Sequence, residues 1–418
     1  MNVYFAGIGG VALGPLAEIA RDLGYSVAGS DPNEGLMTKR LAETGVMISA
    51  DQSGEFLQAR HQERVIDWFI YTSAMPDDHP ELARARELGI AHIVKRNEFI
   101  NFILAENNLK MIAIAGTHGK TTTTAMFVWA LQQLGIPVSY SIGTTISFGP
   151  SGKYTSGSEY FIYECDEFDR NFLAFSPHLS LITSIDYDHP DTYPTRADYA
   201  AAFSQFMSQS SQVIMWERDT IEGLTTPEKA WKLQPNEIID VPLAGEHNRA
   251  NATLIAKAAE YLALASQEAA KTAIGSFPGS ARRFEKLGDN LYSDYGHHPV
   301  EIAATLQLAR ELSDHVVLVY QPHQNVRQHQ IRDSYTDCMQ LAEQIYWLPT
   351  YLTREDPALP VLTPEDLTQN LVNRTVVEYA DLDSALWEHI ETARTEGKLV
   401  LCMGAGTIDG WLRRQLER

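Results

Sequence analysis

Residues 111–122 read MIAIAGTHGKTT, an apolar run followed by a glycine-rich turn that carries one lysine. The apolar run is typical of a buried strand, and the pattern from Thr121 to Leu134 predicts a helix. Gly116 and Gly119 allow backbone N–H groups to approach an anion closely, and the start of a helix adds favourable partial positive charge. The segment therefore predicts a phosphate-binding loop between a strand and a helix.

The predicted loop differs in length from the common phosphate-loop template. That template has four residues between its glycines, whereas only Thr117 and His118 intervene here. The template's lysine contacts the β- and γ-phosphates and its next hydroxyl binds Mg²⁺, roles that fall here to Lys120 and Thr121. A glycine-rich turn with a merely exposed lysine is the alternative, and the flanking strand and helix favour nucleotide binding. The predicted ATP-binding residues of this loop are Gly116, Thr117, His118, Gly119, Lys120, Thr121 and Thr122.

The order of apolar strand, glycine-rich turn and helix occurs twice more. Residues 2–6 precede Gly7-Ile8-Gly9-Gly10, and residues 399–403 precede Gly404-Ala405-Gly406. Strands that alternate with helices predict parallel sheets covered on both faces. Three well-separated starts in 418 residues predict an α/β protein with three domains.

Two segments indicate the domain boundaries. Residues 101–108 are predicted to be a helix end and a short polar linker. Residues 275–279, which contain Pro278, separate an alanine-rich predicted helix from a new segment near Arg282. The predicted domains are therefore residues 1–107, 108–278 and 279–418.

The composition excludes several classes of protein. The net charge of −21 disfavours general binding to nucleic acid, which requires clustered lysine and arginine. No apolar run is long enough to cross a bilayer, and the N-terminus lacks the basic leader of a signal peptide. The 3 cysteines form no CxxC pair, which favours a reducing compartment and disfavours a structural zinc site. We expect a cytoplasmic protein with neither a nucleic-acid nor a membrane partner.

The first glycine-rich turn is a weaker signal than the phosphate loop. Gly7-Ile8-Gly9-Gly10 resembles a dinucleotide fingerprint, but Ala12 breaks the pattern. Ser30-Asp31 ends the predicted second strand, where an acidic side chain often meets a ribose hydroxyl. Binding of a nucleotide diphosphate, binding of a nicotinamide cofactor and a tight turn without a ligand are all compatible with this turn.

Two acidic segments follow predicted strands. Glu164-Cys-Asp-Glu-Phe-Asp169 follows the strand at 160–163, and Asp186-Tyr-Asp-His189 follows the strand at 179–184. A carboxylate at the carboxyl end of a strand, in the sheet that carries the phosphate loop, is well placed to bind Mg²⁺. His189 is a candidate metal ligand or general base. Taken alone, each segment is equally compatible with a solvated loop.

A further polar segment, AGEHNRAN at 244–251, precedes an alanine-rich predicted helix. His247, Asn248 and Asn251 have spacings that share one face near the start of this helix. Side-chain amides at such a place either contact an adenine edge or cap the helix.

Together these segments resemble the Mur ligase family, the ATP-dependent amide-bond ligases of peptidoglycan precursor synthesis. The matching segments, in chain order, are GTHGKTTTT, ECDEFD, DYDH, GEHNRAN and ARRF. Further segments are similar to those of members that join L-alanine to UDP-N-acetylmuramate, namely FAGIGG, TSAM with HPEL, SDYGHHPVE, YQPH and MGAG. The resemblance covers nearly the whole chain. It implies a Rossmann-like N-terminal domain, a central ATP-binding domain of the phosphate-loop type and a Rossmann-like C-terminal domain.

The resemblance also implies the chemistry and the residues that perform it. ATP and Mg²⁺ activate the carboxylate of UDP-N-acetylmuramate as an acyl phosphate, which the amino group of L-alanine then attacks. The implied UDP-sugar residues are Gly7, Gly9, Gly10, Ser30, Asp31 and Ser73. The implied residues of phosphoryl transfer and metal binding are Lys120, Thr121, Glu164 and His189. The implied adenine, ribose and phosphate contacts are His247, Asn248, Asn251, Asp294 and Arg283, and those near the amino acid are Tyr295, His297 and Arg327.

Several positions depart from the family pattern. Ser184 stands where asparagine is usual, and Gln324 and His329 stand where arginines are usual. The loss of a carboxylate-binding arginine weakens the prediction that the amine is L-alanine, although Arg332 offers another positive charge. No lysine lies between Arg196 and Arg218, so the carbamylated lysine of some sister ligases has no counterpart.

Other functions remain compatible with the sequence. A recycling enzyme of the same family would attach a whole peptide to UDP-N-acetylmuramate, and the aromatic residue before Asp169 resembles that group. A nicotinamide oxidoreductase would use the first glycine-rich turn but leaves the phosphate loop unexplained. A non-catalytic nucleotide-binding relative is the third alternative. We expect a monomer or a weak homodimer.

Overall fold

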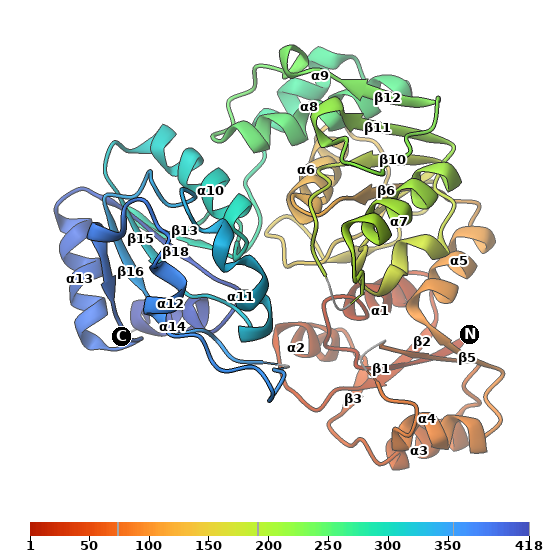
Figure 1. Ribbon diagram of the computed structural model, residues 1–418. Coiled ribbons are helices and arrows are strands. Elements are labelled where there is room, and N and C mark those ends of the chain that lie inside the picture. Colours follow the sequence, from red (N-terminus) through yellow and green to blue (C-terminus); the bar gives the residue numbers. More distant parts are fainter. Residues whose placement is uncertain (73–74, 190–191, 354, 418) are drawn as a thin grey trace. The chain divides into compact units, whose positions relative to one another are not determined.

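The computed structural model describes residues 1–72, 75–189, 192–353 and 355–417 (Figure 1). It contains three sheets, each with helices, so the chain is an α/β protein with three domains. Inter-residue contacts divide it into two compact units: residues 1–241 with 251–277, and residues 242–250 with 278–418. Each unit is described by itself below. The domain boundaries at 107 and 278 remain a prediction.

The first sheet has five parallel strands in the order β3-β2-β1-β4-β5. The strands are β1 (Asn2–Ala6), β2 (Ser26–Ser30), β3 (Met47–Ser49), β4 (Trp68–Tyr71) and β5 (His92–Lys95). The helices are α1 (Gly14–Asp22), α2 (Leu36–Glu43), α3 (Glu55–Glu63), α4 (Pro80–Glu87) and α5 (Arg96–Glu106). Alternate residues of β1 enter different apolar clusters: Val3 and Phe5 pack with α1 and α5, and Tyr4 packs with α3 and α4. Burial on both faces explains why β1 is apolar throughout.

The second sheet has the order β12-β11-β10-β6-β9-β7-β8 and is parallel except for the β7–β8 pair. The strands are β6 (Lys110–Ala115), β7 (Ser139–Ser141), β8 (Gly152–Lys153), β9 (Tyr160–Glu164), β10 (Leu179–Ile182), β11 (Gln212–Trp216) and β12 (Ala230–Leu233). The helices are α6 (Lys120–Gln133), α7 (Arg196–Gln209), α8 (Glu246–Tyr261) and α9 (Gln267–Gly275). The strand β6 lies between β9 and β10, so the loop after β6 opens where the strand order reverses, the usual place for a ligand in such sheets.

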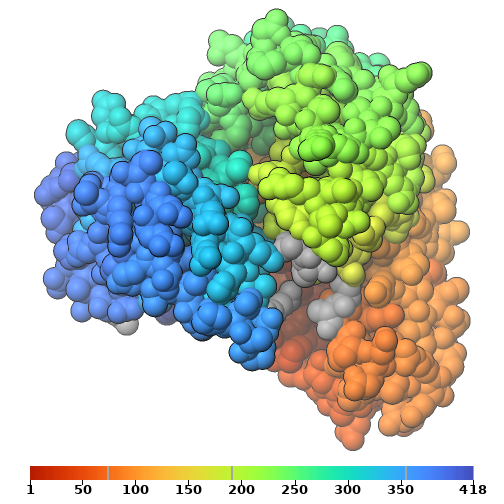
Figure 2. Space-filling model, viewed as in Figure 1, coloured from red at the N-terminus to blue at the C-terminus, as the bar shows by residue number. Residues whose placement is uncertain are grey.

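The first two sheets share one apolar core within the first unit. Phe5 and Phe99 from the first sheet's side join Phe161 and Phe172 in one buried cluster. Helix α1 packs so closely on β8 that a Cβ on Gly152 would lie 1.9 Å from the Pro15 carbonyl oxygen. Figure 2 shows the early residues (red to orange) and the residues near 160–210 (yellow-green) side by side at the surface.

The third sheet has the order β13-β14-β18-β15-β16-β17 and is parallel except for the β13–β14 pair. The strands are β13 (Glu285–Gly288), β14 (Leu291–Asp294), β15 (Val316–Tyr320), β16 (Gln344–Trp347), β17 (Val377–Tyr379) and β18 (Leu399–Met403). The helices are α10 (Pro299–Leu312), α11 (Asn325–Ile331), α12 (Pro364–Thr368), α13 (Ser384–Thr395) and α14 (Ile408–Leu416). Alternate residues of β15 face α10 on one side and α13 with α14 on the other.

The three predicted strand–turn–helix starts are confirmed at β1, β6 and β18. The prediction of a helix end and a short polar linker within 101–108 is confirmed, because α5 ends at Glu106 and the polar pair Asn107–Asn108 follows it before β6. Ile100 and Ile103 are buried, and their helical spacing keeps this turn of the helix on the core. Within the described ranges, no helix combines the length and apolarity needed to span a membrane.

Candidate active site

Two glycines give the loop after β6 its shape. Gly116 has a φ of 134° and Gly119 a φ of 85°, both in the region that disfavours side chains. A Cβ on Gly116 would lie 2.4 Å from the Thr183 hydroxyl oxygen and 2.7 Å from the Ser184 carbonyl oxygen. The loop therefore packs directly on the residues that follow β10, and only glycine fits at position 116.

Ser184 holds the phosphate loop in place. Its hydroxyl accepts a 2.9 Å hydrogen bond from the His118 backbone N–H, and its carbonyl accepts one of 3.0 Å from the Thr117 N–H. The side chain of Ser184 thus supplies a fixed acceptor to the loop, although the related pattern has asparagine at this position. Replacement of the usual asparagine by Ser184 therefore preserves hydrogen bonds that hold the phosphate loop.

The Lys120 ammonium group lies above the loop with three acceptors. It donates to the carbonyl oxygens of Gly116 (2.5 Å) and Thr117 (3.1 Å) and to Glu167 Oε2 (2.7 Å). Burial opposes the positive charge, but the carboxylates of Glu167 and Asp166 outweigh it and raise the pKa of Lys120 above its usual value. Lys120 is therefore a partly buried cation at the N-terminus of α6, where anions bind favourably.

Thr121 and Glu164 form the oxygen-rich part of the site. The Thr121 hydroxyl donates to Glu164 Oε1 (2.7 Å), and the Gly143 N–H donates to Glu164 Oε2 (2.8 Å). A hydroxyl and a carboxylate in contact are the ligand types that Mg²⁺ prefers, so these residues fit a magnesium ion. Thr122 lies in the same first turn of α6.

His189 approaches the site from the loop after β10. Its Nε2 lies 3.6 Å from Glu167 Oε1 and 3.7 Å from Asp188 Oδ2. Its backbone φ of 55° lies in the left-handed region, which histidine adopts more often than most residues other than glycine do. The Phe168 ring packs edge-on against the imidazole at 5.1 Å between centroids.

Glu167 is the residue that sequence reasoning missed. It lies in the acidic segment from which Glu164 was selected, and its side chain is fully buried, at 0% exposed. Burial raises its pKa, and the neighbouring Lys120 and His189 counteract that increase. The only signal in the sequence was the run of four carboxylates, which does not indicate the buried one.

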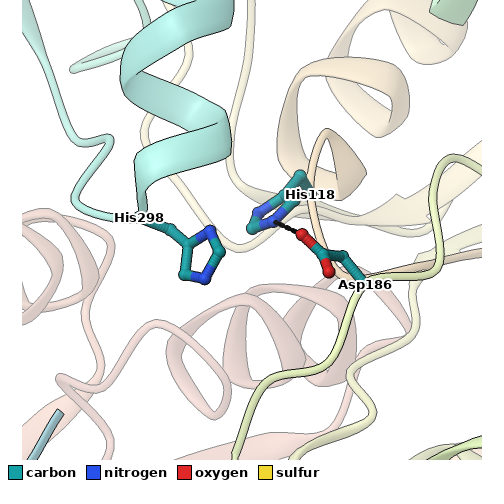
Figure 3. A group of neighbouring side chains, drawn as sticks. All are labelled: His118, Asp186 and His298. Atoms are coloured by element: carbon teal, nitrogen blue, oxygen red, sulfur yellow. Dashed lines mark ion pairs between the residues drawn. The ribbon is translucent and has the colours of Figure 1, made fainter. Parts of the chain in front are cut away.

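A second histidine–carboxylate pair lies on the other side of the loop. His118 Nε2 is 3.7 Å from Asp186 Oδ2, the ion pair drawn as a dashed line in Figure 3. The Thr117 hydroxyl donates to the Asp186 carbonyl (2.7 Å) and accepts from the Asp186 N–H (2.8 Å). The phosphate loop is therefore held by hydrogen bonds to both Ser184 and Asp186, and the Thr117 side chain makes those to Asp186.

Of the three polar residues predicted at the start of α8, Asn251 lies against the phosphate loop. A Cβ on Gly119 would lie 3.2 Å from the Asn251 amide nitrogen. His247 and Asn248 belong to the second unit. Burial lowers the pKa of His247 to about 4. The Asn248 amide donates to the Ala244 carbonyl (2.9 Å), whereas a capping side chain would accept from a backbone N–H.

The first glycine-rich turn is held by the end of β2. The Gly7 and Ile8 N–H groups donate to the Ser30 carbonyl at 2.8 and 3.0 Å. The Gly9 N–H donates to Asp31 Oδ2 at 2.9 Å, and the Gly10 N–H donates to the Gly7 carbonyl at 3.1 Å. Asp31 thus closes the turn from the position where a ribose contact was predicted.

Ser30, which is predicted to bind the UDP-sugar, turns its hydroxyl into the protein, and its contact with the ligand stays a prediction. Ser30 is 0% exposed, and its hydroxyl donates to Glu81 Oε2 (2.8 Å) on the inner side of the sheet. The Tyr4 hydroxyl donates to Glu81 Oε1 (2.7 Å), which completes a buried network. Ser73, also predicted to bind the UDP-sugar, lies outside the described residues.

In the second unit, Asp294 and Arg283 lie around Tyr295. Asp294 accepts hydrogen bonds from the Phe284 and Gly296 N–H groups, both at 2.7 Å, so it orders the segment around the predicted site. Burial raises the pKa of Asp294 to about 6, against the effect of Arg283. The Arg283 guanidinium lies over the Tyr295 ring, 5.1 Å from its centroid.

The structure brings His297 and Arg327 into direct contact. Arg327 Nη1 touches His297 Nε2, and His297 Nδ1 lies 3.2 Å from the Tyr295 carbonyl oxygen. Burial lowers the pKa of His297 to about 4, although Glu301 opposes the shift, so the imidazole is neutral at pH 7. His329 Nε2 lies 2.8 Å from the Pro360 carbonyl oxygen, a contact to the protein's own backbone.

Models of one protein family match successive parts of this chain. Residues 2–107 match the Mur ligase family catalytic domain, residues 114–234 the Mur ligase middle domain and residues 282–406 the Mur ligase glutamate ligase domain. A UDP-N-acetylmuramate–L-alanine ligase from Brucella anthropi is 30% identical, and the match covers 98% of this chain and 95% of the relative.

Solved structures share the fold. The crystal structure of UDP-N-acetylmuramate–alanine ligase MurC from Thermotoga maritima has a TM-score of 0.75 at 24% identity and covers 100% of this chain and 99% of the other. A murein peptide ligase from Psychrobacter arcticus has a TM-score of 0.65 at 24% identity and covers 100% and 98%.

Proposed function

Because the chain belongs to the Mur ligase family, we propose that it joins L-alanine to UDP-N-acetylmuramate in an ATP-dependent reaction of peptidoglycan precursor synthesis. It is an enzyme that forms carbon–nitrogen bonds. The observation that carries the proposal is the Lys120–Thr121–Glu164 arrangement at the phosphate loop, found in a chain that matches L-alanine-adding relatives over nearly its whole length.

The first half-reaction takes place at the phosphate loop. The substrate carboxylate attacks the γ-phosphorus of ATP, the bond to the β-phosphate oxygen breaks, and an acyl phosphate and ADP result. Lys120 and the N–H groups at the start of α6 stabilise negative charge on the transferred group. Thr121, Glu164 and His189 would hold Mg²⁺, which supplies further charge neutralisation when bound.

The second half-reaction forms the amide. The amino group attacks the acyl carbon, a tetrahedral intermediate forms and phosphate leaves. His297 and His189 are the candidate bases for the amine proton. Burial keeps the His297 imidazole neutral, but its pKa of about 4 makes it a weak base, so it would accept the proton only with help from its surroundings. Arg327, which touches His297, is a candidate partner for the amino-acid carboxylate.

The first glycine-rich turn is the proposed site for the UDP-sugar. Gly7, Gly9 and Gly10 let the backbone approach the diphosphate, and Asp31 holds the turn through the Gly9 N–H. Tyr295 and the residues around Asp294 and Arg283 line the proposed amino-acid and nucleotide contacts of the second unit. We assign the reaction to the cytoplasm, which agrees with three buried free cysteines.

A peptide-adding relative is the second candidate. Phe168 packs on His189 and resembles the aromatic residue of peptide-recycling ligases, and a murein peptide ligase shares the fold. The two candidates differ only in the amine, so the reaction at the phosphate loop is the same for both.

The decisive experiment measures phosphate release from ATP with Mg²⁺ and UDP-N-acetylmuramate, using L-alanine, L-serine, glycine or a tripeptide as the amine. Release that requires L-alanine supports the proposal. Phosphate release that requires the tripeptide would mean that the protein is a peptide-recycling ligase. No release with any amine, despite tight ATP binding, would contradict both candidates and favour a non-catalytic relative.

A further inference from the structure

Glu167 lies at the phosphate centre, yet the proposed reaction gives it no role. Its side chain is fully buried, and its Oε2 lies 2.7 Å from Lys120 Nζ. Its other oxygen, Oε1, has no hydrogen-bond partner within the part of the chain that the structure describes. Buried acceptors rarely lack a partner. The carboxylate therefore has incomplete contacts in this arrangement of the site.

The Lys120 ammonium has complete contacts. An ammonium group has three N–H donors, and Gly116 O, Thr117 O and Glu167 Oε2 accept one each. A phosphate that binds Lys120 must displace one of these acceptors. The two carbonyls belong to the loop itself, whereas the carboxylate comes from a separate segment after β9 and carries the charge that a phosphate replaces.

We propose that Glu167 is a positioning residue that holds Lys120 over the phosphate loop until a nucleotide phosphate takes the place of its carboxylate. The inference rests on the proposed function, because it takes Lys120 as a phosphate ligand. Exchange of one anion for another keeps the buried ammonium neutralised throughout, which avoids the large cost of an unpaired buried charge. The released carboxylate has His189 Nε2 3.6 Å from Oε1, so another nitrogen atom that can become its hydrogen-bond partner is close at hand.

This exchange has a measurable consequence. Phosphate must compete with Glu167 for Lys120. The free enzyme should therefore bind polyphosphate more weakly than it would without the Glu167 carboxylate. Glu167→Gln keeps the shape and an acceptor oxygen but removes the competing charge. It should tighten the binding of metal-free ADP or tripolyphosphate by about tenfold, a coupling of ordinary size between two linked sites.

The experiment measures binding of ADP and of tripolyphosphate by calorimetry in EDTA. The variants are Glu167→Gln, Lys120→Met and the double variant, with Asp169→Asn as the matched control. Asp169 lies two residues away, is exposed and has a left-handed backbone that asparagine tolerates. The expected result is tighter binding in Glu167→Gln only, and loss of that gain when Lys120 is also replaced.

Three outcomes would overturn the inference. A gain that persists in the double variant, or that also occurs in Asp169→Asn, would mean general electrostatics rather than control of Lys120. Weaker binding in Glu167→Gln together with a lower Tm would mean a merely structural role. Should Glu167→Gln fail to fold, Glu167→Asp withdraws the carboxylate from Lys120 while keeping the charge buried, and unchanged binding in that variant would contradict the inference. If the wild type shows no ADP binding that depends on Lys120, the proposed function itself fails.

Discussion

Two buried glutamates stand behind the two glycine-rich loops of the first unit, and they differ in their partners. Glu81 supports Ser30, whose carbonyl holds the first loop, and Glu167 supports Lys120 above the phosphate loop. Both are 0% exposed, and burial raises the pKa of both. Glu81 accepts from the neutral hydroxyls of Tyr4 and Ser30, whereas Glu167 faces a cation and an imidazole.

The comparison shows what separates a phosphate-transfer loop from a binding turn. Both loops have glycines with positive φ after the central strand of a parallel sheet. The glycines therefore give only the backbone shape. The side chains behind the two loops differ in charge. We infer that the neutral network at Glu81 serves as a scaffold, whereas the ionic network at Glu167 would present charge to a ligand.

The largest expected effect is that of Lys120→Ala, which removes the cation from the ionic network. We expect phosphate release to fall about 10³-fold or more, because the developing charge on the transferred group loses its main neutralising side chain. Circular dichroism should show the fold intact. Lys271→Ala, a change on helix α9 away from the loop, is the control and should leave the rate unchanged. Retained activity in Lys120→Ala would refute the assignment of the phosphate loop.

Glu164→Gln should have the next largest effect. The change removes a charged ligand from the proposed magnesium site and one acceptor for the Thr121 hydroxyl or the Gly143 N–H. We expect turnover to fall about 10²-fold and the required Mg²⁺ concentration to rise. Mn²⁺ binding followed by electron paramagnetic resonance measures the metal directly. Glu159→Gln, an exposed change at the opposite end of β9, is the control; equal Mn²⁺ affinity in the two variants would contradict the metal assignment.

The ionic network was only partly predictable from the sequence. Local patterns were sufficient for Lys120, Thr121 and Glu164, because each lies directly at the end of a strand or the start of a helix in one sheet. The role of Glu167 was not predictable. Asp169 and Arg170 have left-handed φ values of 54° and 55°, so the segment is irregular, and no helical or strand periodicity in the sequence indicates which carboxylate is buried.

In the neutral network, the direction of the Ser30 side chain was not predictable, for a different reason. The prediction for Ser30 rested on its position at the end of β2, and the position is correct. The direction of its hydroxyl depends on Glu81, which is 51 residues away and arrives on a separate helix. Such a long-range partner leaves no local periodicity in the sequence.

Asp31→Asn tests the first loop as a binding turn. The Asp31 carboxylate accepts from the Gly9 N–H and the Asn33 N–H, and asparagine retains one acceptor oxygen. Loss of one hydrogen bond to a charged group should raise the KM for UDP-N-acetylmuramate about tenfold. The KM for ATP should not change, because the phosphate loop has its own supports. Steady-state kinetics with each substrate varied in turn measure both constants, and a matching rise for ATP would mean that the two loops are not independent.

The smallest effect expected is that of Glu81→Gln, and it concerns stability rather than turnover. Burial raises the pKa of Glu81 above its usual 4.5, so the folded protein holds the proton to a higher pH than the unfolded chain does. The stabilising contribution of this group is therefore complete below pH 4.5 and is lost as the pH rises through the raised pKa. Glutamine removes this dependence.

We therefore expect the Tm of Glu81→Gln to rise relative to that of the wild type between pH 5 and pH 8, because only the wild type loses the contribution of the protonated carboxyl over this range. Thermal unfolding at the two pH values measures the gain, and Glu87→Gln, an exposed change on the same helix α4, is the control. Parallel pH profiles for Glu81→Gln and the wild type would mean that Glu81 titrates normally in the folded protein. The neutral network would then not differ from the ionic one in the way that the partners of the two glutamates indicate.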